Sequence, residues 1–373
     1  MSVLSPILRQ WQRITGTGEY SVTVPVMDGP LKPDDALDRA TLVANLPGAA
    51  NLVARDGRLL ISQGAQVLAV GPSGQTSVVA EVSGPISALA VGPGGQLAIG
   101  IAGKGVDLRG AQGTRHIATA GRTALTCVTA LCFLPDGRLA IANGSATVAP
   151  QDWAHDLMAH GRSGSVALVD PGPDTARVLV GGLRFPAGLC AIGNDPDRLA
   201  VTEAWAHRLI EISVPRQAVT GVLADHLPAY PARLTAGQDG GYLLATYATR
   251  SQLIEFILRE ARYLRRMRHE VAPDYWIAPA LRSGASFKEP LQAGGVIRLG
   301  IHKPWAPTRS YGLLIGLTPD FRPTWSAHSR ADGQRHGITS AADTTDGLFA
   351  LSQGNGDLIR LGQQDTPVTE TSQ

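Results

Sequence analysis

The chain has 373 residues, and its 33 Lys and Arg residues nearly balance its 31 Asp and Glu residues, which gives a formal net charge of +2. This balance gives no reason to expect nucleic acid or an anionic membrane as a partner. No run of residues approaches the ~20 apolar positions that span a bilayer, and the first residues lack the features of a signal peptide. We therefore expect a cytoplasmic protein.

The beginning of the chain lacks the pattern that fills the rest. Residues 1–38 contain no repeat and are interpreted as an N-terminal extension. Residues 39–46 have the apolar character of a strand. We predict that this segment is the outer strand of the last unit of a ring, because closed β folds avoid an unpaired edge by borrowing a strand from one terminus.

Six times along the chain an apolar run meets a tight turn and then a second apolar run. These units occupy residues 48–62, 85–100, 128–142, 185–202, 230–246 and 337–352. Each is typical of two strands joined by a hairpin, because Asp-Gly and Gly-Gly tolerate the positive φ of tight turns. A spacing of ~40 residues is that of a four-stranded propeller blade. We predict an all-β, six-bladed β-propeller over residues 39–362 and a polar tail at 363–373.

Two insertions interrupt the repeats, at residues 144–163 and 251–293. In the second, apolar residues recur at three- and four-residue steps from Ile254 to Val271, which predicts one amphipathic helix beginning near Ser251. Its arginines should lie mainly on the outer, solvated side. They are Arg259, Arg262, Arg265, Arg266 and Arg268. Both insertions follow the second strand of a unit, so both should cover the same mouth of the central tunnel, the face on which we expect a ligand.

Polar and aromatic side chains gather near this mouth in the predicted topology. Histidine and glutamate are suitable general bases when neighbours tune their pKa values, and arginine binds carboxylates and oxyanions. The candidate catalytic residues are Glu203, His207 and His336. The candidate substrate-binding residues are Asn143, His155, Trp205, Arg233, Tyr247, Arg335 and Ser340. An alternative stays open for Glu203 and His207, which flank a tight connection between two strands and could instead bond the backbone of that connection.

Several phrases in a fixed order resemble the strictosidine synthase-like proteins. They are GSVALVDP at 164–171, FPAGL at 185–189, VTEAWAHRLIEI at 201–212, LPAYPARL at 227–234 and HGITSAADTTDGLFALS at 336–352. The resemblance extends over residues 45–362. It implies a six-bladed propeller akin to the gluconolactonase-like and paraoxonase-like lactonases, in which Glu, Asn and Asp residues at the start of the first strands hold a divalent cation at the tunnel mouth.

The residues that the resemblance aligns with those ligands carry no charge. The matching positions hold Ala50, Ser87, Thr129, Ala187, Ala232 and Ser340. A hard cation needs about six oxygen ligands, several of them anionic, so we predict no catalytic metal and no other cofactor. The condensation catalysed by strictosidine synthase relies on a Glu in the last blade, where Ser340 stands, so that reaction is not expected either.

Two classes of function stay open. The first, which we favour, is a metal-independent hydrolase or lyase that acts on a small ester, lactone or cyclic amide at the tunnel mouth. It would use His or Glu as a base and Arg as the partner of an oxyanion or carboxylate. The second is a non-catalytic propeller that binds a metabolite or a protein partner through the same mouth.

Overall fold

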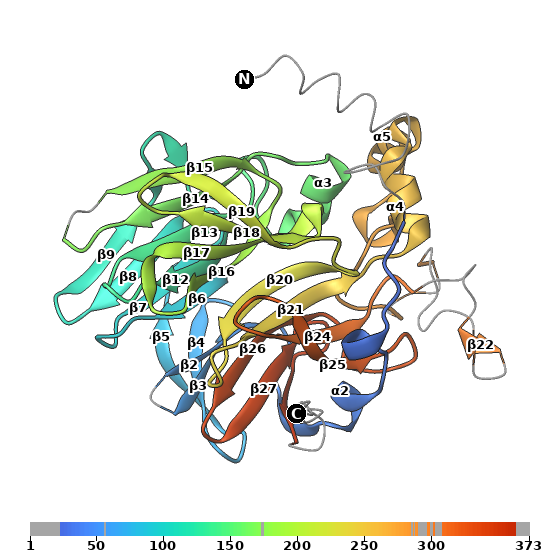
Figure 1. Ribbon diagram of the computed structural model, residues 1–373, viewed down its shortest axis with the longest axis horizontal. Coiled ribbons are helices and arrows are strands. Elements are labelled where there is room, and N and C mark those ends of the chain that lie inside the picture. Colours follow the sequence, from blue (N-terminus) through green and yellow to red (C-terminus); the bar gives the residue numbers. More distant parts are fainter. Residues whose placement is uncertain are drawn as a thin grey trace.

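Six β-sheets surround a central axis in the computed structural model, which describes residues 23–55, 57–172, 175–284, 286, 288–289, 297–298, 301–302 and 308–362 (Figure 1). The first strand of each sheet contacts the first strands of both neighbouring sheets, which closes a ring. This arrangement confirms the predicted six-bladed propeller. The first strands, which we call the inner strands, are β2 (Ala49–Arg55), β6 (Ile86–Val91), β12 (Val128–Phe133), β16 (Pro186–Ile192), β20 (Ala229–Ala236) and β26 (Ile338–Thr344).

Each inner strand is followed outward by antiparallel strands of the same blade. Blades one to three continue with β3 (Arg58–Gln63), β4 (Gln66–Val70) and β5 (Thr76–Glu81); β7 (Leu97–Ile101), β8 (Gly105–Gly110) and β9 (Gly113–Ile117); and β13 (Leu139–Asn143), β14 (Gly164–Val169) and β15 (Ala176–Leu183). Blades four to six continue with β17 (Asp195–Glu203), β18 (Arg208–Ser213) and β19 (Ala218–Ala224); β21 (Tyr242–Thr249), β24 (Gly312–Leu317) and β25 (Pro323–Ser329); and β27 (Gly347–Ser352) and β28 (Asp357–Leu361). The short strands are β10 (Thr119–Ala120) and β11 (Thr123–Ala124) at the edge of blade three, and the paired β22 (Ile297–Arg298) and β23 (Ile301–His302).

The ring is closed by a strand from near the N-terminus. Strand β1 (Thr41–Asn45) pairs antiparallel with β28, with Thr41 opposite Arg360 and Asn45 opposite Asp357. The prediction that residues 39–46 supply the outer strand of the last blade is therefore confirmed. Blade six thus contains chain from both ends of the propeller.

The segment before β1 covers the outer edge of blade five. It contains η2 (Gly29–Leu31) and α2 (Ala36–Arg39), and both contact β25. Asp34 Oδ1 accepts a hydrogen bond from the backbone N of His328 at 2.9 Å, and Ser326 Oγ donates to the carbonyl of Pro30 at 2.8 Å. These contacts protect an edge strand that would otherwise be open to pairing. Residues 1–22 and the predicted tail at 363–373 lie outside the described residues.

The insertions supply the helices above the tunnel mouth. The first holds η3 (Pro150–Asp152) and α3 (Trp153–Met158), and the second holds α4 (Gln252–Arg259), α5 (Ala261–Glu270) and η5 (Pro273–Tyr275). The predicted single helix is wrong, because the chain leaves helical geometry at Glu260 (φ −85°, ψ 75°). The start is as predicted, since Ser251 Oγ caps α4 by accepting from the N of Ile254. None of the described helices is long and apolar enough to cross a membrane.

The break lets both helices direct apolar residues into one cluster. Ile254 and Leu258 of α4 join Leu264 and Met267 of α5 in a buried core that includes Trp205 of the propeller. Val271, predicted for the same face, is instead 37% exposed. Most of the insertion beyond residue 284 lies outside the described residues.

Every inner strand also carries a β-bulge near its start. The register breaks between Ala50 and Leu52, Ile86 and Ala88, Val128 and Ala130, Pro186 and Gly188, Pro231 and Leu234, and Ile338 and Ser340. A bulge leaves a residue out of the ladder and turns its side chain and carbonyl toward other partners. Because the inner strands begin at the same end as the insertions, the six bulges ring the covered mouth.

Candidate functional site

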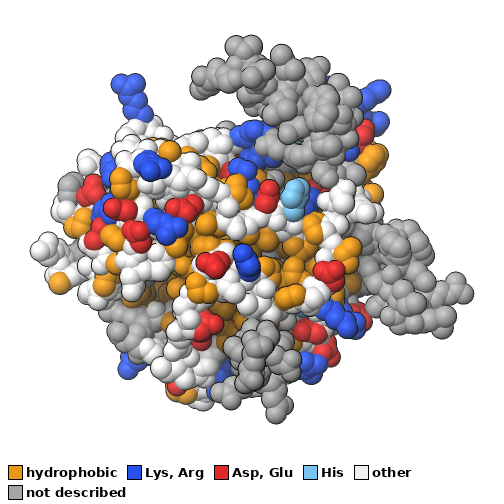
Figure 2. All heavy atoms as spheres, viewed as in Figure 1, with side chains coloured by type: hydrophobic (Ala, Val, Ile, Leu, Met, Phe, Trp, Pro, Cys, Tyr) orange, Lys and Arg blue, Asp and Glu red, His pale blue; other side chains and the backbone are white. Residues whose placement is uncertain are grey.

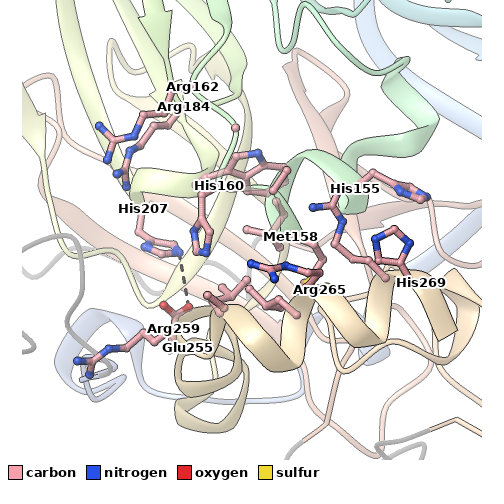
Figure 3. A pocket seen from close by; sticks show the side chains of 18 residues that line it. His155, Met158, His160, Arg162, Arg184, His207, Glu255, Arg259, Arg265 and His269 are labelled. Atoms are coloured by element: carbon pink, nitrogen blue, oxygen red, sulfur yellow. Dashed lines mark ion pairs between the residues drawn. The ribbon is translucent and has the colours of Figure 1, made fainter. Parts of the chain in front are cut away.

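A cavity of about 520 Å³ lies between the two insertions, and we call it the basic pocket (Figure 3). Its walls come from α3 and the loop after it, from η4 (Ala204–Ala206), and from α4 and α5. Among the described lining residues, Glu255 is the one acid. The basic lining residues are Arg162, Arg184, Arg259, Arg265 and Arg268, with His155, His160, His207 and His269. On the face drawn in Figure 2, acidic and basic side chains are interspersed.

His207 is held in the wall of the basic pocket by an unusual backbone. Its φ of 52° lies in the left-handed region, which non-glycine residues adopt mainly where the surrounding structure imposes it. Its Nε2 is buried and has no hydrogen-bond partner among the described residues. Burial, with smaller contributions from Arg250 and His226, holds the pKa of His207 well below its usual value. The imidazole is therefore neutral at pH 7.

Glu255 of α4 is the acidic group nearest to His207. Its Oε1 lies 3.6 Å from His207 Nε2, and it accepts hydrogen bonds from the Tyr230 hydroxyl at 2.8 Å and from Arg250 Nε at 3.2 Å. Burial, and then the carboxylate of Glu255, raise the pKa of Tyr230. The ring of His207 packs edge-on against that of Tyr230, with 4.9 Å between their centroids. These contacts fix the imidazole against a carboxylate that is itself neutralised by Arg250.

Aromatic side chains support the side of the pocket nearest the tunnel. Trp205 stacks on Phe185 at a centroid distance of 4.5 Å, and its Nε1 donates to Asp156 Oδ1 at 2.8 Å. This bond ties the first insertion to blade four. Trp153 of α3 stacks on Tyr247 at 5.4 Å. Burial raises the pKa of Tyr247 to about 12, so its hydroxyl stays protonated.

His155 also belongs to this wall. Its ring meets that of Trp276 edge-on at 4.6 Å, and it lines the basic pocket with Trp205 and His207. The structure thus brings together three of the ten residues that the sequence singled out. Their roles in binding and catalysis stay predictions.

Arg233 is not among the residues that line the basic pocket. It extends from β20 into the central tunnel, where Nη2 donates to the carbonyl of Ser87 at 2.9 Å and Nη1 to that of Thr339 at 3.4 Å. Burial lowers its pKa, and Tyr247 opposes this shift. The guanidinium and the Tyr247 ring therefore lie near each other at the tunnel side of the mouth.

Glu203 and Asn143 make bonds that hold the scaffold together. Glu203 is 2% exposed, and its carboxylate accepts from the backbone N of Arg184 at 2.8 Å and from Arg208 Nη2 at 2.6 Å. Asn143 accepts from the N of Cys127 at 2.9 Å and donates to the carbonyl of Ser145 at 2.9 Å. Glu203 thus bonds backbone, but at Arg184 between β15 and β16, and not in the connection between Glu203 and His207 that the alternative specified.

His336 is held in a loop between blades five and six. It is 6% exposed, its Nδ1 lies 2.8 Å from Ser310 Oγ, and its Nε2 donates to the carbonyl of Arg330 at 2.8 Å. Burial lowers its pKa. Both ring nitrogens are thus occupied within the protein.

Arg335 and Ser340 bond other parts of the frame. Arg335 donates to the carbonyl of Ala40 at 3.2 Å and pairs with Asp357 at 3.6 Å, so it ties the N-terminal segment to blade six. Ser340 Oγ accepts from the backbone N of Leu52 at 3.0 Å, which satisfies the bulge of the neighbouring inner strand.

The helix arginines were expected mainly on the solvated side, and this is confirmed: Arg262, Arg265, Arg266 and Arg268 are exposed, and Arg259 is partly exposed. Arg259, Arg265 and Arg268 line the basic pocket. Arg184 and Glu255, which complete it, were not among the candidates. A usable signal was present: two insertions predicted to cover one mouth both carry basic residues, so their basic faces could have been expected to meet.

No protein-family model matches this chain, and no curated protein sequence matches it significantly. Solved structures share its architecture. A gluconolactonase from Xanthomonas campestris superposes with a TM-score of 0.56 at 12% identity, covering 91% of this chain and 97% of that one. A calcium-binding regucalcin from Agrobacterium tumefaciens gives a TM-score of 0.54 at 13% identity, covering 87% and 93%. At this identity the likeness shows the propeller fold alone, and the resemblance to strictosidine synthase-like proteins stays a prediction.

The residues of this chain do not fit a divalent cation of the kind that the regucalcin name implies. Within the described ranges, no group of three or more His, Cys, Asp or Glu side chains is placed to hold a metal ion. At the tunnel, the carbonyls of Ser87 and Thr339 already accept from Arg233, and that of Pro186 accepts from Thr129 Oγ1. A guanidinium among occupied carbonyls is a poor setting for a hard cation, which needs anionic oxygens.

Proposed function

We propose that the protein is a hydrolase that opens a small, negatively charged lactone or ester in the basic pocket without a metal ion. The proposal depends on His207, a neutral imidazole with a strained backbone in the wall of a pocket lined by five arginines. A small anion suits such a wall, because arginine binds a carboxylate through two parallel N–H bonds. Membership of the strictosidine synthase-like proteins and a cytoplasmic location are further proposals, which rest on the sequence.

In the proposed reaction, water attacks the carbonyl carbon while His207 takes a proton from that water. The C–O bond then breaks, and the departing alkoxide takes the proton back from the His207 imidazolium, so a lactone becomes a hydroxy acid and His207 is again neutral. The arginines bind the charge of the substrate and the oxyanion that develops during attack. An anionic substrate also raises the pKa of His207 from its lowered value, because nearby negative charge favours the imidazolium. Substrate binding thereby makes His207 a stronger base.

A second function, binding of an anionic metabolite without turnover, is supported by a different observation. Glu203 and His336, the other predicted catalytic residues, have their side chains occupied by bonds within the scaffold. Binding would need the arginines of the pocket but not the base.

The test is hydrolysis of a panel of lactones and esters that carry a carboxylate, with and without a chelator. We expect turnover that the chelator leaves unchanged. His207→Gln should lower kcat by ~10²–10⁴-fold, the range for loss of a general base, and Arg265→Gln should mainly raise KM. The matched control is His116→Gln, which changes a half-exposed histidine paired with Asp107 in blade two.

Each outcome separates the alternatives. Loss of turnover with chelator and its recovery with calcium would refute the metal-free reaction. An unchanged kcat in His207→Gln would remove His207 as the base. If the wild type binds the anions and hydrolyses none of them, the second function holds and the first fails.

A further inference from the structure

A guanidinium crosses the central tunnel of the propeller. Arg233 belongs to β20 in blade five, Ser87 to β6 in blade two and Thr339 to β26 in blade six. In a ring of six, blades two and five are three places apart and face each other across the axis. The 2.9 Å bond from Arg233 to the Ser87 carbonyl therefore spans the tunnel, and the positive charge lies close to the axis.

This charge has no counter-charge among the described residues. Arg233 bonds two backbone carbonyls, and the titratable group that acts on it is the phenol of Tyr247 rather than a carboxylate. Arginine stays protonated in proteins. Arg233 is partly buried, and a charge that is removed from water ordinarily has a partner of opposite charge, since without one it destabilises the fold. A group from solution could supply the missing negative charge.

Ser87, the residue whose carbonyl accepts from Arg233, also carries an unused donor. Its Oγ is buried and has no hydrogen-bond partner within the described ranges, although its carbonyl holds Arg233. Buried hydroxyls nearly always have a partner. The hydroxyl and the remaining N–H groups of Arg233 thus form a set of donors that a small acceptor anion would satisfy.

We propose that the axis of this propeller binds a small anion, such as a carboxylate group, between Arg233 and the Ser87 hydroxyl. The charge pattern is the reverse of a cation site: the cation is built into the chain, and the ligand from solution is the anion. The site is distinct from the basic pocket, whose lining includes neither Arg233 nor Ser87, and it does not depend on the proposed hydrolysis.

Bromide and formate are the probes. In crystals soaked with bromide, we expect an anomalous peak beside Arg233 in the wild type, in His207→Gln and in Arg265→Gln, and none in Arg233→Met. By calorimetry at constant ionic strength, Ser87→Ala should weaken formate binding by about tenfold, as expected for one hydrogen bond to a charged group. Ser87→Ala retains both carbonyl bonds of Arg233, so it stays informative if Arg233→Met fails to fold.

The proposal is overturned if the wild type shows only water beside Arg233, or if Ser87→Ala binds formate as tightly as the wild type. Calcium bound at the axis, at the millimolar concentrations that fill weak protein sites, would overturn it too. Because bromide binding in His207→Gln is read without any substrate, failure of the anion site and failure of the proposed hydrolase are distinguishable.

Discussion

The attachment of the N-terminal segment to blade five should make the stability of the protein sensitive to acid through His328. This residue is fully buried in β25, with Nδ1 3.1 Å from the Tyr311 hydroxyl and Nε2 2.7 Å from Ser326 Oγ. Burial lowers its pKa from 6.5 to about 4, and Asp34 only partly opposes this. Between these two pH values the unfolded chain binds a proton at His328 and the folded chain does not, so the free energy of unfolding falls as the pH falls.

The size of this effect follows from linkage, since each pH unit between the two pKa values is worth ~1.4 kcal/mol. Between about pH 6.5 and about pH 4.5, His328 should therefore remove roughly 3 kcal/mol of stability. The assay is urea unfolding of the wild type and His328→Gln at about pH 7 and about pH 4.5. The His328→Gln variant should be less stable than the wild type at both pH values. When the pH is lowered from about 7 to about 4.5, its free energy of unfolding should fall by roughly 3 kcal/mol less than that of the wild type. Parallel losses in the two proteins would refute the reasoning.

Two further substitutions test the interpretation of the scaffold. Glu203→Gln should leave kcat unchanged and lower stability by about 1–3 kcal/mol, less than for a fully buried pair because Arg208 is 35% exposed; a large loss of kcat at unchanged stability would restore Glu203 as a catalytic candidate. Gly188→Ala should lower the free energy of unfolding by about 2–3 kcal/mol, because a Cβ there would lie 2.5 Å from the carbonyl oxygen of Ala232 on the next inner strand. The control Gly181→Ala, with nothing within 4 Å of its added Cβ, should change stability by less than about 1 kcal/mol, and equal effects at the two glycines would contradict the close approach.

The ring and its closure could be predicted because they depend on short-range patterns. Apolar runs around Gly turns are local signals, and turn glycines such as Gly95 (φ 73°) and Gly137 (φ 87°) adopt the positive φ that their sequence requires. The prediction that both insertions cover one mouth needed only strand direction. Helical periodicity likewise gave the start of α4 at its Ser251 cap.

The side chains of the tunnel could not be predicted, because their direction depends on the bulges. One extra residue reverses which side chains face the axis. The sequence alignment put Ala50 and Ser340 at the mouth, whereas Asn51 and Thr339 occupy the bulges. For the same reason Arg233 was identified as a ligand-binding candidate without any sign that it would bond carbonyls in two other blades.

The pocket formed by the helix arginines could not be predicted, for a different physical reason. Helical periodicity assumes an unbroken helix, and the non-helical dihedrals of Glu260 start a new one at Ala261. Arg265 and Arg268 are exposed, as predicted, and they also line a cavity whose opposite wall belongs to another insertion. No local pattern contains that long-range contact.

The pairing of β1 with β28 also determines how the molecule should respond to tension. The chain enters β1 at Thr41 and leaves β28 at Leu361, and Thr41 lies opposite Arg360, so both ends emerge from the same side of the blade. When the two termini are pulled apart and α2 has detached, the hydrogen bonds between β1 and β28 are loaded one after another. This is the unzipping geometry, whereas in the shear geometry all the bonds of a strand pair are loaded together. The seam of the ring should thus be its mechanically weakest line, even though the rest of each blade is continuous chain.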